Sequence, residues 1–194
     1  MSNTTQLIGI YSGTFDPVHV GHVSFALAAA KVMKLESVYF IPEKLPRDKN
    51  GATSIQDRLK MLNMAVKGHK NLHVISLPDE QFSIQHTLPL LQKMFIGSEL
   101  VFMCGSDVAK TFAYRWPGLD TLLQAVKIVI GVRGGDSAEE LNKIMSSLQI
   151  KAEYTLVNAK NHHLASTSIR RGKHKIEDLN KEVAEYIVSN KLYS

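Results

Sequence analysis

Strand-like and helix-like segments alternate along the whole chain, and this alternation restricts the possible fold more than any other feature. Short apolar runs are separated by longer segments with apolar residues at helical spacing. Repeated strand-helix-strand units form right-handed crossovers, which build a parallel sheet with helices on both faces. The sequence therefore predicts an α/β fold with a doubly wound, mostly parallel sheet. Strands are expected at Leu7–Ser12, Ser37–Pro42, Leu72–Leu77, Leu100–Gly105, Lys127–Val132 and Glu153–Val157, and helices at His22–Met33, Ser54–Val66, Ile84–Met94, Leu119–Ala125, Ala138–Leu148 and Ile176–Asn190.

The segment Gly13–His22 lies at the first strand-to-helix crossing and reads G-T-F-D-P-V-H-V-G-H. Such crossings bind phosphates in α/β folds, because free N–H groups and the positive end of the helix dipole face the ligand. Gly13 lets the backbone approach a ligand, and Gly21 lets the helix start close to its neighbours. In a helix that begins near His19, the imidazoles of His19 and His22 lie at i and i+3, on one face of the first turn. We expect both to point toward an anion.

Two alternatives exist for this pair of histidines. One is a turn in which one imidazole is packed and the other solvated. The other is a zinc site, but Cys104 is the only cysteine and no nearby residues complete a set of ligands. Because glycine, proline and paired histidines converge at one crossing, we favour phosphate binding and expect no metal ligands. Asp16 is expected to stabilise the turn, with a place beside magnesium as its alternative.

Composition restricts the class of protein. A chain of 194 residues suits one domain over residues 1–194. A single cysteine indicates a reducing compartment, Met1–Gln6 is too polar for a signal peptide, and no apolar run could span a bilayer. We therefore expect a cytoplasmic protein with no membrane partner. The net charge of +5 suits nucleotide phosphates; because only Arg170, Arg171, Lys173 and Lys175 form a dense basic cluster, nucleic acid is the weaker alternative.

A second phosphate signal, Ser166–Arg170, follows the last predicted strand. Hydroxyls at the start of a short helix cap its backbone N–H groups, and the same N–H groups can hold a phosphate. Arg170 would add a guanidinium that can bind phosphate through two bonds. A plain helix cap followed by a solvated basic run is the alternative. A doubly wound sheet brings distant strand ends to one edge, so both signals can share one ligand.

Together the two signals resemble the nucleotidyltransferase superfamily. His19-Val20-Gly21-His22 matches its H-x-G-H element, and Ser166-Thr167-Ser168-Ile169-Arg170 matches its distal S-T-x-I-R element in the form typical of nicotinate and nicotinamide mononucleotide adenylyltransferases. The likeness to the bacterial nicotinate mononucleotide enzymes covers almost the whole chain. Weaker matches follow in order: Ile41-Pro42 with Pro46 and Lys49, Arg58–Leu62 as R-x-x-M-L, Gly105-Ser106-Asp107 with Trp116, and Leu192-Tyr193.

The resemblance implies a Rossmann-like nucleotidyltransferase fold with C-terminal helices. It also implies that the partners are ATP, which carries Mg²⁺ on its phosphates, and a pyridine mononucleotide; a homo-oligomer stays open. His19, His22 and Arg170 would be catalytic. The implied ATP-binding residues are Gly13, Thr14, Phe15, His19, His22, Gly105, Asp107, Ser166, Thr167 and Arg170, and the implied residues for the second substrate are Lys49, Arg58, Thr87, Trp116 and Arg133.

Several of these residues have structural alternatives. Asp107 can cap a helix, Trp116 can be a core residue, and Lys49 or Arg58 can form surface ion pairs. Two segments near the pyridine nucleotide depart from the family pattern: Pro46-Arg47-Asp48 replaces Pro-Pro-His, and residues 81–87 replace a Ser/Thr-Tyr-Thr signature. Other phosphate monoesters, such as nicotinamide mononucleotide, phosphopantetheine or glycerol phosphate, therefore stay open, as does a nucleotide-binding regulator without turnover. The helix that opens in residues 82–87 would offer free N–H groups to a carboxylate, which favours the acid form of the pyridine.

Overall fold

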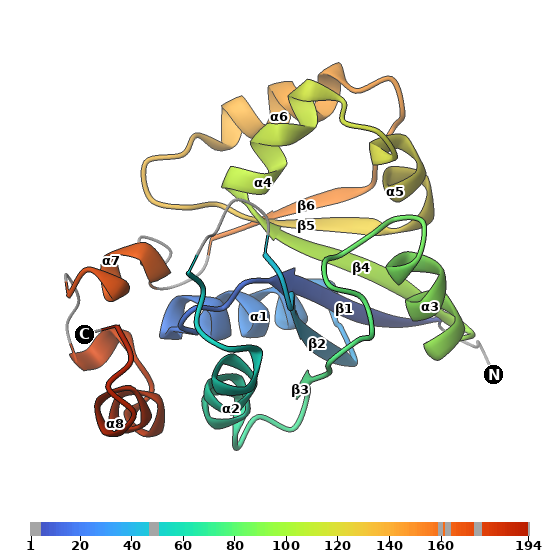
Figure 1. Ribbon diagram of the computed structural model, residues 1–194. Helices are drawn as coiled ribbons and strands as arrows, with labels where there is room; N and C mark the ends of the chain where they lie inside the picture. Colours follow the sequence, from blue (N-terminus) through green and yellow to red (C-terminus); the bar gives the residue numbers. More distant parts are fainter. Residues whose placement is uncertain (1–4, 47–50, 159–160, 162–163, 173–175, 194) are drawn as a thin grey trace.

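A sheet of six parallel strands forms the centre of the protein (Figure 1). The structure is a computed structural model that describes residues 5–46, 51–158, 161, 164–172 and 176–193. Within these residues the strands are β1 (Gln6–Gly13), β2 (Ser37–Pro42), β3 (Leu72–Val74), β4 (Ser98–Gly105), β5 (Lys127–Gly131) and β6 (Tyr154–Val157). Their order across the sheet is β3-β2-β1-β4-β5-β6, and every adjacent pair is parallel. The predicted α/β fold is confirmed.

Helices cover both faces of this sheet (Figure 1). Helices α1, α2 and α8 pack on one face, and α3 to α6 pack on the other. Their bounds are α1 Val20–Met33, α2 Ile55–Val66, α3 Thr87–Met94, α4 Ser106–Thr111, α5 Leu119–Ala125, α6 Ala138–Ser147, α7 Ser166–Arg170 and α8 Lys181–Ser189, with 3₁₀ turns at Phe112–Tyr114 and Ile176–Asp178.

Some predicted boundaries were wrong because side chains redirect the backbone. The expected last helix over 176–190 is interrupted, since Asn180 caps α8 by accepting a hydrogen bond from the Glu182 N–H. Helix α3 starts at Thr87 instead of Ile84. Strand β3 is short because the chain leaves the sheet after Ile75, whose N–H donates to the Phe40 carbonyl of β2.

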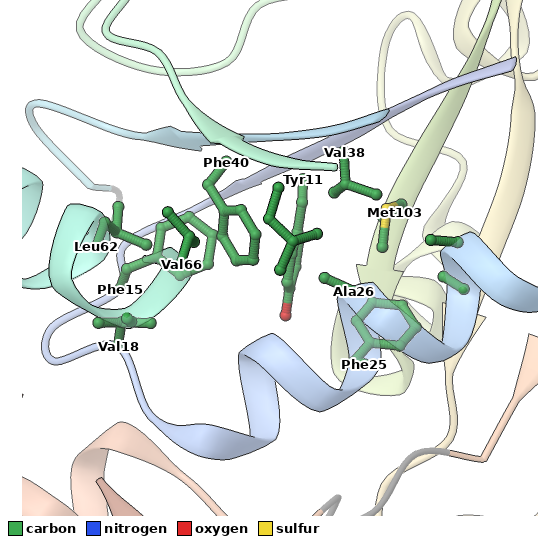
Figure 2. Packing of buried hydrophobic residues seen from close by; sticks show 14 of the residues in the cluster. Tyr11, Phe15, Val18, Phe25, Ala26, Val38, Phe40, Leu62, Val66 and Met103 are labelled. Carbon is green, nitrogen blue, oxygen red and sulfur yellow. The ribbon is translucent and has the colours of Figure 1, made fainter. Parts of the chain in front are cut away.

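Alternation along the strands divides the core into two layers. In β1, Ile8 and Ile10 face the layer under α3 to α6, whereas Tyr11 faces α1 and α2. Figure 2 shows the Tyr11 side of the sheet, where its ring lies among aromatic neighbours. The ring centroid of Tyr11 is 5.2 Å from that of Phe15 and 5.3 Å from that of Phe40. This aromatic packing fixes the end of β1, from which the Gly13–His22 segment leaves the sheet.

The strand order places a crevice beside that segment. The chain proceeds outward from β1 to β2 and β3, and then returns to place β4 on the other side of β1. In open α/β sheets, ligands bind at such a reversal, outside the carboxyl ends of the strands. Here those ends are Gly13 of β1 and Gly105 of β4.

Candidate active site

A cleft of about 620 Å³ opens at this edge of the sheet. Its size is in the range of small-molecule sites. Its walls come from the ends of β1 and β4, from the loop before α3, and from residues after β2 and β5. The lining residues are Tyr11, Ser12, Gly13, Thr14, Phe15, His22, Glu43, Phe82, Ser83, Ile84, Gln85, Phe102, Cys104, Gly105, Asp107, Val108, Thr111, Trp116, Pro117 and Arg133.

A second, smaller cavity of about 30 Å³ adjoins the cleft. Helix α1 contributes Gly21 and Phe25 to it, and His19 lies on the same wall. Four residues line both cavities: Tyr11, His22, Gly105 and Arg133. His22 therefore stands where the two spaces meet, and the smaller space has room for about one water molecule.

The two predicted histidines are in direct contact. His19 is the N-cap of α1, and the His19 and His22 ring centroids are 3.7 Å apart. Nδ1 of His22 accepts a hydrogen bond of 3.2 Å from the His19 backbone N–H. Because Nδ1 is an acceptor there, the proton of a neutral His22 must sit on Nε2, which can then donate to an anion. The predicted i, i+3 arrangement is confirmed.

His19 differs from His22 in its environment. Its side chain is buried, and among the described residues no group hydrogen-bonds to its Nδ1. Burial, with a smaller contribution from the Arg133 charge, lowers the pKa of His19 to about 4. His19 is therefore a neutral donor or acceptor at pH 7. Gly21 is required beside it, since a Cβ there would lie 2.8 Å from the Asn161 carbonyl oxygen.

Phe15 supports His22 from the turn between β1 and α1. Its backbone has a φ of 51°, which is uncommon for a residue other than glycine. Its ring packs edge-on against His22 with centroids 5.1 Å apart. Gly13, Thr14 and Phe15 all line the cleft, as expected for a segment whose backbone approaches a ligand.

The distal motif of the sequence docks on the first motif. The Ser166 hydroxyl donates to the Pro17 carbonyl at 2.9 Å, and Arg170 Nη1 donates to the Asp16 carbonyl at 2.5 Å. Arg170 Nη2 also donates to Thr167 Oγ1 at 3.2 Å. The structure therefore joins the two motifs, as the sequence predicts. Ser166, Thr167 and Arg170 line neither cavity, so their contact with ATP stays a prediction.

Arg133 lines the small cavity together with both histidines and is held by an ion pair. Its Nη1 is 3.3 Å from Oδ2 of Asp107, which also lines the cleft. The backbone N–H of Arg133 donates to the buried Ser106 hydroxyl, which itself donates to Asp136. Hydrogen bonds from Lys110 and Ser106 lower the pKa of Asp136, so its carboxylate is ionised. These linked hydrogen bonds fix the start of the segment after β5.

Arg58 is a structural residue in this fold. Its side chain is only 1% exposed, and its guanidinium donates to carbonyl oxygens on three separate segments. The expected contact with a substrate phosphate stays a prediction, and four of the five N–H donors are used within the protein. The acceptors are Thr53 O at 2.9 Å, Thr14 O at 2.9 Å, Glu43 O at 2.7 Å and Lys44 O at 3.1 Å.

Thr87 is also buried and serves the loop before α3. Its hydroxyl donates to Asp79 Oδ2 at 2.7 Å and accepts from the Ser83 N–H at 2.9 Å. Thr87 does not line the cleft, and its expected contact with a substrate stays a prediction. In the described part of the chain, no hydrogen bond is made by the N–H groups of Ile84 and Gln85. Both residues line the cleft, so the expected helix-opening donors come from this turn.

Trp116 lines the cleft, as predicted for a residue that stacks on a ring. Its Nε1–H donates to Thr111 Oγ1 at 3.3 Å, and its ring lies 6.1 Å from that of Phe112, centroid to centroid. Lys49 lies outside the described residues.

Tyr11 and Glu43 are among the cleft residues that the sequence analysis did not single out. Tyr11 lines both cavities, and burial raises the pKa of its phenol, so it is neutral. Tyr11 could have been found from its position at the carboxyl end of a predicted strand, two residues before the Gly13-Thr14 pair. Glu43 lines the cleft directly after β2, and its Oε1 accepts from the Phe82 N–H at 3.2 Å. A charged residue at the carboxyl end of a buried strand was the signal there.

Two further features concern the described residues alone. They hold no group of three or more His, Cys, Asp or Glu side chains arranged to bind a metal ion. They also form no helix with the length and apolar character that a membrane crossing needs.

Comparison with known proteins identifies a family and similar sequences. Residues 10–172 match the family model described as cytidylyltransferase-like. The chain is 33% identical, over 196 residues, to the probable nicotinate-nucleotide adenylyltransferase of Carboxydothermus hydrogenoformans, covering 96% of this chain and 97% of the relative. It is 33% identical over 137 residues to the protein of that name from Geobacillus kaustophilus, and there it spans only 63% of the relative's length.

The fold also matches solved structures. The Plasmodium falciparum nicotinic acid mononucleotide adenylyltransferase complexed with NaAD superposes with a TM-score of 0.77 over 97% of both chains, at 18% identity. At that identity the match establishes the fold: an all-parallel, Rossmann-like α/β sheet.

Proposed function

Because this chain belongs to the cytidylyltransferase-like family, we propose that it is an adenylyltransferase that joins ATP to nicotinate mononucleotide, giving deamido-NAD and pyrophosphate. One observation carries the proposal. Two phosphate motifs, far apart in sequence, are hydrogen-bonded to each other beside a cleft of nucleotide size. We infer the substrate from the relatives that match over nearly the full length, which are named probable nicotinate-nucleotide adenylyltransferases.

The reaction needs positioning more than acid-base chemistry. A phosphate oxygen of the mononucleotide bonds to the α-phosphorus of ATP, while the bond from that phosphorus to the bridging oxygen breaks and pyrophosphate leaves with the electron pair. The second pKa of a phosphate monoester is about 6, so the nucleophile is already ionised at neutral pH. The remaining barrier comes from bringing two anions together and from charge on the leaving group.

The residues divide between these tasks. We assign the Nε2–H of His22 to the transferring phosphate, because His22 stands where the two cavities meet. Arg133, which also lines both cavities, would neutralise the same charge. His19 is neutral, so it would contribute a hydrogen bond and no charge. Arg170 would bind the outer phosphates from the turn on which it is anchored.

Mg²⁺ would arrive with ATP as part of the substrate. This ion prefers octahedral oxygen ligands and commonly keeps several waters while it binds phosphates. We place it on the phosphate oxygens of ATP.

The cleft suits the acid form of the pyridine. The N–H groups of Ile84 and Gln85 offer two donors to a carboxylate, and Trp116 offers a flat surface for the ring. Two N–H donors on one turn suit the two oxygens of a carboxylate better than a carboxamide, which has only one acceptor oxygen. We therefore propose selectivity for nicotinate mononucleotide over nicotinamide mononucleotide. The cytoplasmic location expected from the sequence stays a prediction.

The test measures pyrophosphate release with saturating ATP and each mononucleotide in turn. We expect kcat/KM to be higher for the acid; equal values would refute the selectivity. His22→Ala should lower kcat by about 10²–10³-fold, as for loss of one preorganised donor. His69→Ala, which changes a histidine after α2 that lines neither cavity, is the matched control. If the parent protein transfers to neither mononucleotide, a panel of other phosphate monoesters with ATP and CTP identifies the acceptor instead.

A further inference from the structure

The Asp16 carboxylate is a buried junction within the turn that carries the histidines. Its residue is only 2% exposed. Oδ2 accepts from the Thr53 N–H at 3.2 Å, and Oδ1 accepts from the Tyr193 hydroxyl at 2.6 Å. The backbone carbonyl of the same residue accepts from Arg170. Asp16 thus joins the turn to three segments that are distant in sequence.

Tyr193 reaches Asp16 from beyond α8. The chain turns back after that helix through hydrogen bonds from Lys191 N–H to Val188 O and from Leu192 N–H to Ile187 O. Leu192 and Tyr193 then pack against the core layer under α1 and α2. Burial and the bond to Asp16 raise the pKa of Tyr193, so its phenol remains protonated and acts as a donor.

We propose that Tyr193 is a positioning residue for nucleotidyl transfer: its hydroxyl fixes the Asp16 carboxylate and thereby the turn that presents His19 and His22. The proposal rests on the function proposed above. A buried carboxylate oxygen that loses a donor must turn toward another donor or admit water. Either change displaces the backbone of Asp16, to which Arg170 is anchored. One hydroxyl outside both cavities would therefore control the geometry of both phosphate motifs.

The chain supplies a matched control. The Tyr186 hydroxyl, on α8, donates to Asp57 Oδ1 at 2.6 Å, the same length as the Tyr193 bond to Asp16. Asp57 lies in the first turn of α2, where its backbone N–H is capped by Ser54, and it lines neither cavity. Tyr186→Phe and Tyr193→Phe each remove one tyrosine-to-aspartate hydrogen bond and keep the ring. Only the second bond reaches the histidine turn.

The experiment measures kcat, KM for ATP and the melting temperature of each variant. The kinetic constants are measured well below both melting temperatures, so that both proteins are folded. A misplaced reacting group costs up to about 100-fold in rate. We expect Tyr193→Phe to lower kcat by about 10-fold or more, and Tyr186→Phe by less than about twofold. The melting temperature should fall more in Tyr193→Phe, because its acceptor Asp16 is only 2% exposed. Combined with Arg170→Lys, Tyr193→Phe should give a non-additive loss of kcat, because both act through Asp16, whereas Tyr186→Phe should add independently.

Two results would overturn the inference. One is a kcat for Tyr193→Phe within about twofold of the Tyr186→Phe value in an active protein. The other is unchanged backbone hydrogen exchange over residues 14–22 in Tyr193→Phe. A turn that has lost the hydrogen bond between Tyr193 and Asp16 should exchange its amide protons faster. Hydrogen exchange is measured without substrate, so it tests whether Tyr193 holds the turn even if the parent protein releases no pyrophosphate. An absence of pyrophosphate release from the parent protein would refute the proposed function and leave this test in place.

Discussion

Replacing Arg58 by lysine separates a structural role from a substrate-binding role. The guanidinium makes four hydrogen bonds to backbone carbonyls on the segments after β1, after β2 and before α2. A lysine keeps the charge, but its single ammonium group cannot span three segments, and we expect it to lose two of the four bonds. Hydrogen bonds from a charged group contribute about 1.5–3 kcal/mol each. The loss should therefore be about 3 kcal/mol, or more if the freed carbonyls stay dry.

The assay is urea unfolding of the ligand-free protein. With a slope of about 2–3 kcal/mol per molar, a loss of this size lowers the midpoint by about 1 M and leaves the slope unchanged. Arg115→Lys is the control, because Arg115 is exposed and its Nη2 donates to Ser147 O at 2.9 Å. Its loss should stay within about 0.5 kcal/mol.

The reasoning would be refuted by a particular pair of results. If Arg58→Lys unfolds at the same midpoint as the parent and yet raises KM for the mononucleotide, then the guanidinium faces the ligand. If the buried contacts are real, the midpoint falls, while KM in the folded protein changes little because the charge remains.

Three shorter predictions concern the site itself. The pKa of His19 is lowered from 6.5 to about 4 in the folded protein. Between pH 6.5 and 4 the imidazole is therefore protonated in the unfolded chain and neutral in the folded protein, so the free energy of unfolding decreases as the pH falls through that range. Urea unfolding should show about 2 kcal/mol of this loss between pH 7 and pH 5, and His19→Asn should remove it; an equal slope in both proteins contradicts the assignment. Arg170→Lys should lower kcat/KM for ATP, and Arg170→Ala should lower it more, since lysine lacks the planar fork; parent-like values in both would leave Arg170 as an anchor alone. Trp116 is the only tryptophan, so its fluorescence should change on titration with the mononucleotide, and Trp116→Ala should raise KM for that substrate with little effect on KM for ATP.

The layer structure could be predicted because it depends on local patterns. Alternating apolar runs identify strands and helices, and the handedness of crossovers then leaves few topologies. The ends of the helices and strands were harder to predict from the sequence, because they depend on single side chains. The hydroxyl of Thr87 shortens α3, and the side chain of Asn180 interrupts the last helix. Neither bond leaves a signal in residue spacing.

The site was predictable in its location and less so in its roles. The Gly13–His22 segment and Ser166–Arg170 each read as phosphate motifs, and the sheet topology brings them together. Arg58 shows the limit of that reasoning, because an arginine near a site has the same sequence signature whether it donates to a ligand or to carbonyls. The Tyr193 bond to Asp16 joins residues 177 positions apart, so no local pattern announces it.

The docking of the distal motif also has a consequence for the order in which a newly made chain acquires its properties. Ser166 and Pro17 are 149 positions apart, and Arg170 and Asp16 are 154 apart. All the described strands are complete once β6 has been made, at Val157. Since chains are made from the N-terminus onward, the sheet can assemble during translation while the turn that holds the histidines still lacks its partners. Catalytic competence should thus appear later than the sheet, once Ser166, Arg170 and Tyr193 have been made.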